Sequence, residues 1–257
     1  MPFLRFLCLS LVAVFGFSTS VTAADRVTVR MGEPLPRFQL LRPGTVTYLR
    51  HWIMADGSLE PIDVQAKEVR FETQDGIRRV RIVQNWVGPT RSLKLDSLFE
   101  DKTLRPITHQ RDSNKDGVIK REGFRFLGDK VVGIADQPEN FQKDFEIATP
   151  VPTFNFEVDL ETLTVLPLVR NAEFEIVFYH PGGSAPAPYL FKVIGEENLS
   201  LAGMPIECWV IATDYNREGT PVSRFWVAKD SQMVVRAHYP LQDGSAVVKV
   251  LLPAASF

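Results

Sequence analysis

The chain has 257 residues, and its 45% hydrophobic content is typical of a globular protein rather than a disordered one. Its 29 basic and 31 acidic residues give a formal net charge of −2, so the basic excess of nucleic-acid-binding proteins is missing. We therefore expect a folded protein with no nucleic-acid partner.

Residues 1–23 have the pattern of a secretory signal peptide. Arg5 precedes an apolar run over residues 6–17, and small and polar residues follow it. The apolar run is too short for a stable membrane span. The sequence therefore predicts an exported protein that is periplasmic in a Gram-negative bacterium. After signal removal, residues 24–257 are expected to form a single soluble β-rich domain without a membrane span.

Alternating apolar and polar residues predict a first group of strands over residues 40–149. In the run 77–87, for example, Val80, Ile82 and Trp86 share one face and polar side chains share the other. Similar runs, separated by turn residues, lie over residues 44–54, 64–72, 77–87, 91–99 and 106–112, and residues 123–134 suggest two short strands around Gly128-Asp129. Short alternating runs between turn signals are typical of antiparallel sheets.

A second group of strands is predicted over residues 170–252. Its runs lie over residues 172–180, 189–199, 206–215, 221–229, 233–241 and 245–252. No linker long enough to separate two domains lies between the groups. We therefore expect an all-β fold, a strongly curved antiparallel sheet of about a dozen strands that forms an open barrel or β-spiral.

One short helix is predicted near the middle of the chain, over residues 159–166. Asp159 is a candidate N-cap, and Pro167 is expected to end the helix because proline cannot continue the hydrogen-bonding pattern. We expect this helix to fill the concave side of the sheet.

Cys208 is the only cysteine left once the signal peptide, which contains Cys8, has been removed. No intramolecular disulfide is then possible. The thiol lies in an apolar alternating run and has no nearby base, which favours a buried structural role over catalysis. An intermolecular disulfide stays open as an alternative.

Residues 112–117 match the first half of an EF-hand calcium loop, with Asp112, Asn114 and Asp116 at ligand positions. An EF-hand also needs a glutamate at position 12 and flanking helices, whereas position 12 here is Gly123 and the flanks alternate like strands. Asp-Gly pairs favour tight hairpin turns, and three further pairs separate other predicted strands. The sequence therefore predicts a hairpin turn at Asp116–Gly117, with no metal and no cofactor.

No catalytic motif is recognisable in the sequence, so the protein is not expected to be an enzyme. One alternative is an envelope hydrolase or carbohydrate-modifying enzyme whose site is assembled from Asp96, His109 and Asp112 on adjacent strands. Another alternative is a purely structural interaction module.

The tryptophans are candidates either for the core or for a ligand-binding surface. The four candidate ligand-binding residues are Trp52, Trp86, Trp209 and Trp226. On a concave sheet they would receive a hydrophobic ligand. We therefore expect a non-enzymatic binding or scaffold protein of the cell envelope, whose partner is a lipid, a lipoprotein or another envelope protein.

The C-terminal strands also carry a family resemblance. The stretch "ENLSLAGMPIECWVIATDY" is followed by "PVSRFWVAKDSQMVVRAHYPLQDGSAVVKVLL", and "DSLFEDKTLRPITHQRD" lies upstream. Together they resemble a bacterial secreted family known as domain of unknown function 3108, over residues 40–252. The resemblance implies an exported β-rich protein and transfers no catalytic residue. A looser similarity, at the level of the fold, links the arrangement to LolA/LolB-like periplasmic lipoprotein carriers.

Overall fold

A computed structural model describes residues 26–253, and the predicted signal peptide lies outside the described residues. The first strands are β1 (Arg26–Val29), β2 (Gly44–Ile53), β3 (Leu59–Gln74), β4 (Ile77–Val87), β5 (Arg91–Glu100), β6 (Pro106–Lys115), β7 (Val118–Phe126), β8 (Lys130–Gly133), β9 (Glu146–Ala148) and β10 (Phe154–Asn155). The later strands are β11 (Glu173–Tyr179), β12 (Ala187–Leu201), β13 (Met204–Thr213), β14 (Ser223–Ala228), β15 (Val234–Pro240) and β16 (Ala246–Leu252). The helical segments are η1 (Phe38–Leu40), η2 (Phe156–Val158) and α1 (Asp159–Thr164).

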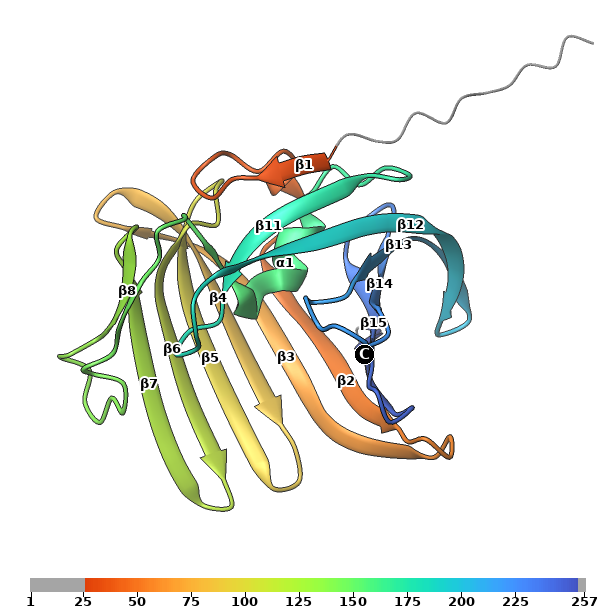
Figure 1. The fold of residues 1–257 in the computed structure, drawn as a ribbon, viewed down its shortest axis with the longest axis horizontal. Helices are drawn as coiled ribbons and strands as arrows, with labels where there is room; N and C mark the ends of the chain where they lie inside the picture. Colours follow the sequence, from red (N-terminus) through yellow and green to blue (C-terminus); the bar gives the residue numbers. More distant parts are fainter. Residues whose placement is uncertain (1–25, 254–257) are drawn as a thin grey trace, which may run out of the picture.

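All sixteen strands form one curved sheet, as Figure 1 shows. Most neighbours in the sheet are consecutive in the chain, so hairpins build the two predicted strand groups. The groups are joined by antiparallel pairing of β16 with β2, where Val248 lies opposite His51. The predicted all-β, curved and continuous sheet is therefore confirmed.

The described residues form sixteen strands instead of the predicted dozen, because the prediction missed the shortest ones. The strands β1, β9 and β10 have four, three and two residues, too few to show an alternating pattern. Both β1 and β10 pair with β11 in parallel, whereas an entirely antiparallel sheet was predicted. Parallel neighbours are distant in the chain, so no turn between them marks the pairing.

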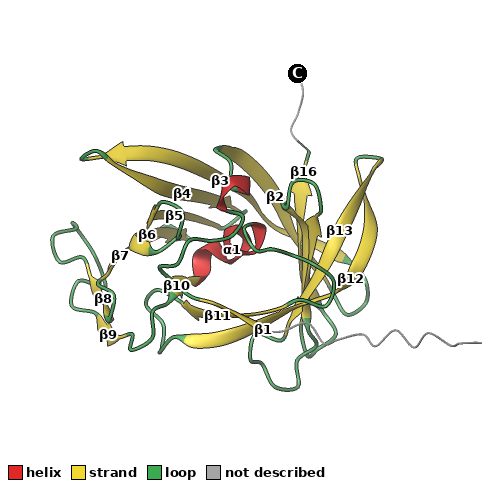
Figure 2. Cartoon of the chain, turned by 90° about the horizontal axis from the view of Figure 1, so that it is seen from above, coloured by secondary structure: helices red, strands yellow, loops and turns green. Residues whose placement is uncertain are grey.

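The inner face of the sheet surrounds α1, as Figure 2 shows from above. Side chains alternate as predicted on β4. Val80 and Ile82 are fully buried in the hydrophobic core that also contains residues of α1, whereas Arg81 points outward and forms an ion pair with Asp96. From the helix, Leu160 and Leu163 pack into the same core. The predicted helix on the concave side is thus confirmed.

The ends of this helix differ from the prediction. Asp159 is not the N-cap, because the 3-10 turn η2 precedes α1 and Asn155 caps that turn by accepting from the backbone N–H of Glu157 at 3.0 Å. The helix also ends at Thr164, two residues earlier than expected. Pro167 disfavours helical geometry in the residue before it, which accounts for an early end.

Asp116 and Gly117 lie at the exposed tip of the hairpin between β6 and β7, as predicted. Their φ angles are +53° and +84°, the two left-handed conformations that a two-residue type I′ turn requires. Asn114 accepts a hydrogen bond from the backbone N–H of Gly117 at 3.1 Å. The motif therefore forms a turn in which Asn114 stabilises the backbone.

The weakest extracellular calcium sites have dissociation constants of about 1 mM. We expect about 5 mM calcium, which would fill even such a site, to leave the melting temperature of the protein unchanged. The backbone pairing of β6 with β7 already stabilises this hairpin without an ion. Differential scanning fluorimetry with calcium, and with magnesium as the control, checks this. A calcium-specific rise that is lost in D116N would contradict the assignment of these residues to a turn.

Cys208 is fully buried on β13, where a structural thiol was expected. Burial, with Asp230 and Glu197 nearby, raises the pKa of the thiol to about 11. The thiolate is the reactive form of cysteine, so this group is poorly nucleophilic at neutral pH. In the described part of the chain, no helix has the length and apolar character needed to cross a membrane.

Candidate functional site

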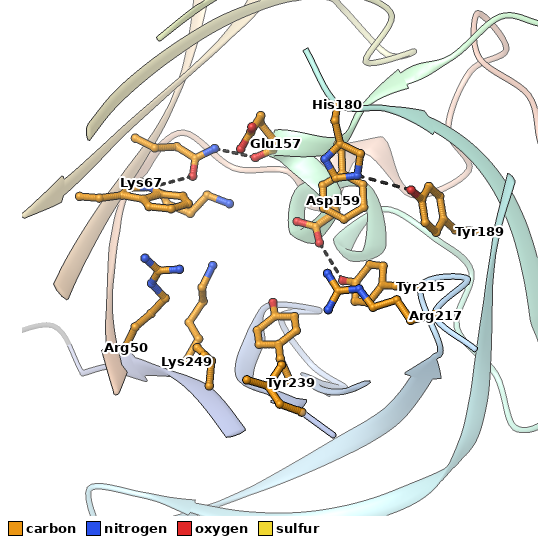
Figure 3. A pocket seen from close by; sticks show the side chains of 15 residues that line it. Arg50, Lys67, Glu157, Asp159, His180, Tyr189, Tyr215, Arg217, Tyr239 and Lys249 are labelled. Carbon is orange, nitrogen blue, oxygen red and sulfur yellow. Dashed lines mark hydrogen bonds between the residues drawn. The ribbon is translucent and has the colours of Figure 1, made fainter. Parts of the chain in front are cut away.

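A cavity of about 370 Å³ lies on the concave side of the sheet, at the beginning of α1 (Figure 3). Its aromatic lining, with one histidine, consists of Trp86, Phe156, His180, Tyr189, Tyr215 and Tyr239. Its charged lining consists of Arg50, Lys67, Glu157, Asp159, Arg217 and Lys249. The cavity thus gathers side chains from both strand groups and from the helical segment between them.

The aromatic side chains pack against one another. Phe156 stacks on His180 with a centroid distance of 3.8 Å, and it meets Tyr189 and Tyr215 at 5.6 Å each. Tyr239 stacks on Tyr215 at 6.4 Å. Because these rings hold one another in place, they form a preorganised apolar surface.

Sheet register places the charged side chains in a row. Lys249 on β16 lies opposite Arg50 on β2, which in turn lies opposite Asp63 on β3. Arg50 donates to Asp63 through Nε at 2.8 Å, and Arg91 donates to the same carboxylate at 3.2 Å. Burial by itself would raise the pKa of Asp63. The hydrogen bonds and charges of the two arginines have the larger combined effect, so the pKa of Asp63 lies below its usual value. Two arginines therefore share one buried carboxylate.

Lys67 forms a buried ion pair with Glu161 of α1. Its Nζ lies 2.8 Å from Oε1 and 2.9 Å from Oε2, and the side chains are only 2% and 10% exposed. The pair ties the helix to β3. Lys67 also lines a second cavity of about 300 Å³, whose lining includes Leu160 and Met233, so the ion pair lies between the two cavities.

Lys249 is buried without such a partner. The residue is 8% exposed, and within residues 26–253 its ammonium forms no salt bridge or hydrogen bond. Its Nζ lies 5.7 Å from the ring centre of Tyr48 and 5.9 Å from that of Trp86. Burial, followed by the charge of Lys67, lowers the pKa of Lys249 to about 7.

Asp159 is the acidic group at the centre of the cavity in Figure 3. Its Oδ2 accepts from the hydroxyl of Tyr215 at 3.2 Å, and its Oδ1 accepts from the backbone N–H of Leu160 at 2.8 Å. Burial raises its pKa, against the opposing charges of Lys249 and Lys67. The other acid, Glu157, is held by Arg111 at 2.7 Å.

The structure places one of the four predicted tryptophans at this cavity. Trp86 lines it, and the guanidinium of Arg50 lies 4.5 Å from the centre of its ring. Trp209 instead lies beneath Lys229, and Trp226 is buried in a separate core where its Nε1 donates to Glu197 at 2.7 Å. Trp52 lies on β2 opposite Val247 and is not among the lining residues.

The sequence interpretation missed the cationic residues of the cavity. Their signal was a charge on an apolar alternating face: Lys249 shares a face with Val247 and Leu251, and Lys67 shares one with Val69. An isolated lysine at such a position is unusual, because lysine is rarely buried without a partner.

The proposed hydrolase residues do not come together. They lie on adjacent strands, but His109 pairs with Ser97 on the inner face, whereas Asp96 pairs with Gln110 on the outer face. Asp112 also faces outward and is half exposed. Burial, then Arg111, lowers the pKa of His109 to about 3, and its Nδ1 lies 2.8 Å from the hydroxyl of Ser97. The sheet therefore separates the histidine from both carboxylates.

These features define an all-β protein whose open, curved sheet encloses a short helix and a cavity lined by aromatic and charged side chains, the buried Lys67 and Lys249 among them. The chain belongs to the family described as "Protein of unknown function (DUF3108)", whose model matches residues 46–251. The family resemblance in the sequence is thereby confirmed. No curated protein matches the chain.

Two solved structures are among those similar to this chain. A beta-barrel-like protein of domain of unknown function DUF1849 from Brucella abortus is 11% identical with a TM-score of 0.50, covering 82% of this chain and 95% of that one. At this identity the likeness concerns the fold alone. The hypothetical lipoprotein YmcC from Escherichia coli (K12) is 14% identical with a TM-score of 0.33, covering 83% and 88% of the two chains.

Proposed function

We propose that this protein is a non-enzymatic, exported binding protein of the cell envelope that holds a hydrophobic ligand in the cavity on its concave face. Residues 24–257 act as one domain, and the signal pattern of residues 1–23 supports a periplasmic location. The ligand is a lipid, or an apolar part of a lipoprotein or other envelope component.

The observation that carries this proposal is the cavity with its packed aromatic lining. Its volume of about 370 Å³ lies in the range of about 300–1,000 Å³ of small-molecule sites. Such sites combine apolar walls with a few polar groups that orient the ligand. Here Phe156 and Tyr215 supply part of the wall, and Lys249 and Arg50 are among the polar groups.

A neutral environment-sensitive dye, N-phenyl-1-naphthylamine, tests the proposal. Protein stripped of amphiphiles on a hydrophobic resin should enhance the fluorescence of the dye with an affinity on the order of micromolar. The variant V247W places an indole in the cavity and should weaken dye binding at least tenfold. Its matched control, L59W, changes a residue that is 66% exposed and outside the lining, so its affinity should stay at the wild-type value.

A dye titration with no saturable binding would overturn the proposal, as would equal binding by V247W, provided that both variants retain the wild-type circular dichroism spectrum. Such a result would favour a structural interaction module.

A further inference from the structure

We propose that the ligand of this cavity is an amphiphile with an acidic head group, and that Lys249 and Arg50 bind this head group while the aromatic wall holds the apolar chain. This inference rests on the proposed function and narrows its ligand to one chemical class, a carboxylate or phosphate on an apolar chain.

The first observation is the unpaired ammonium of Lys249. A buried charge is costly unless an opposite charge or hydrogen bonds compensate it. Lys249 is 8% exposed and lines the cavity, yet it forms no ion pair or hydrogen bond within residues 26–253. Lys67, which is 2% exposed, has Glu161 at 2.8 Å. An anionic ligand would supply for Lys249 the partner that the chain itself supplies for Lys67.

The second observation is the position of Arg50 beside Lys249. The two residues are paired across β2 and β16, and both side chains point into the cavity in Figure 3. Asp63 accepts from Nε and Nη2 of Arg50, but Nη1 has no hydrogen-bond partner in the described part of the chain. Since Asp63 is also shared with Arg91, this end of the cavity retains an excess of positive charge.

The acidic residues of the cavity have other partners. Glu157 accepts from Arg111 at 2.7 Å. Asp159 accepts from Tyr215 and from the backbone of Leu160, and it forms no salt bridge with Lys249. Within residues 26–253, neither carboxylate therefore forms an ion pair with Lys249 or Arg50, although Asp159 lies near enough for its charge to act on Lys249.

The shape of the site favours an amphiphile over a small free anion. The positive end opens onto the aromatic part of the same cavity, where Tyr189 and Tyr215 lie across the cavity from Arg50 and Lys249 in Figure 3, with the exposed Arg217 beside Tyr215. A free phosphate would occupy the cations and leave that aromatic surface empty. A ligand with both an acidic and an apolar part would contact Lys249 and Arg50 together with the aromatic side chains.

Displacement of the neutral dye by matched twelve-carbon compounds tests the inference. Dodecanoate and dodecyl phosphate should compete at least tenfold better than dodecanol, because hydrogen bonds to charged groups are about twice as strong as neutral ones. In K249M, the affinities for both acids should fall about tenfold or more, while that for dodecanol stays within about twofold. K249R retains the charge and should keep the preference for acids.

The outcomes separate this inference from the proposed function. Dye binding without any preference for acids, or a preference that K249M leaves intact, would overturn the acidic head group and leave the binding function standing. No dye binding at all would overturn both. Inorganic phosphate is the last compound to be tested. If phosphate stabilises the wild type but not K249M, while the acidic amphiphiles fail to displace the dye, the ligand is a small anion and the inference is wrong.

Discussion

Replacing Glu161 with glutamine should lower the free energy of unfolding by about 3–5 kcal/mol, the usual result of removing one partner from a buried ion pair. The glutamine keeps the size of the side chain but leaves the ammonium of Lys67, which is 2% exposed, without an opposite charge at 2.8 Å. Urea denaturation followed by tryptophan fluorescence measures the effect. K67M should cause a loss of similar size, because it leaves the carboxylate unpaired.

The double variant K67M/E161L distinguishes the pair from the packing around it. With both charges replaced by apolar side chains, most of the stability should return. The surface pair of Arg70 and Glu68 is the matched control, and E68Q should leave the unfolding curve unchanged because both groups are solvated. If E161Q unfolded at the wild-type urea concentration, the pair would have no role in holding α1 to the sheet.

The pair also matters for the cavity, because the segment that it holds to the sheet contributes to the cavity wall. Asp159, the first residue of α1, and Phe156, which lies just before the helix, both line the cavity. Loss of the contact between Lys67 and Glu161 should therefore loosen one wall of the site. We expect E161Q to bind the neutral dye more weakly than the wild type even below its unfolding transition.

The variant K249M should be more stable than the wild type by about 2–4 kcal/mol at pH 6, in protein stripped of ligand. Burial lowers the pKa of Lys249 from 10.5 to about 7, so charging this lysine costs more in the folded chain than in the unfolded one. Below pH 7 both states are protonated and the full penalty is present. Methionine fills a similar volume without a charge.

The gain from K249M should shrink as the pH rises. Between about pH 7 and pH 10.5 the unfolded wild-type chain binds more protons than the folded one, so wild-type stability increases with pH relative to the variant. The charged and titratable groups facing this lysine are Arg50, Tyr48, Lys67, Asp159, Glu161 and Tyr239. Because K249M retains all of them, the difference between the two proteins isolates Lys249.

Urea titrations of both proteins at pH 6, 8 and 9.5 measure this difference. A constant difference across the three conditions would show that Lys249 keeps an ordinary pKa. A K249M protein less stable than the wild type at pH 6 would show that the chain already compensates the ammonium, and the case for an anionic ligand would weaken accordingly.

Local patterns accounted for most of the fold. The alternation on β4 identified Val80 and Ile82 as core residues, and the Asp116–Gly117 pair marked a hairpin tip, because both features depend on residues adjacent in the chain. The break in alternation located α1 for the same reason. What local patterns missed were the strands of two to four residues, β1, β9 and β10, of which β1 and β10 pair in parallel with β11.

The candidate site could be predicted only in small part. Trp86 was recognised because an aromatic residue on an apolar face suggests either core or ligand surface, whereas three equivalent tryptophans lie elsewhere. The sequence by itself determined the longer strands, the turns between them and, on β4, which residues share a face, since these follow from the two-residue period of an extended chain. Only the tertiary structure decided which inward residues meet: pairing of β16 with β2 sets Lys249 beside Arg50, almost 200 positions away, and the register of such distant strands leaves no local trace.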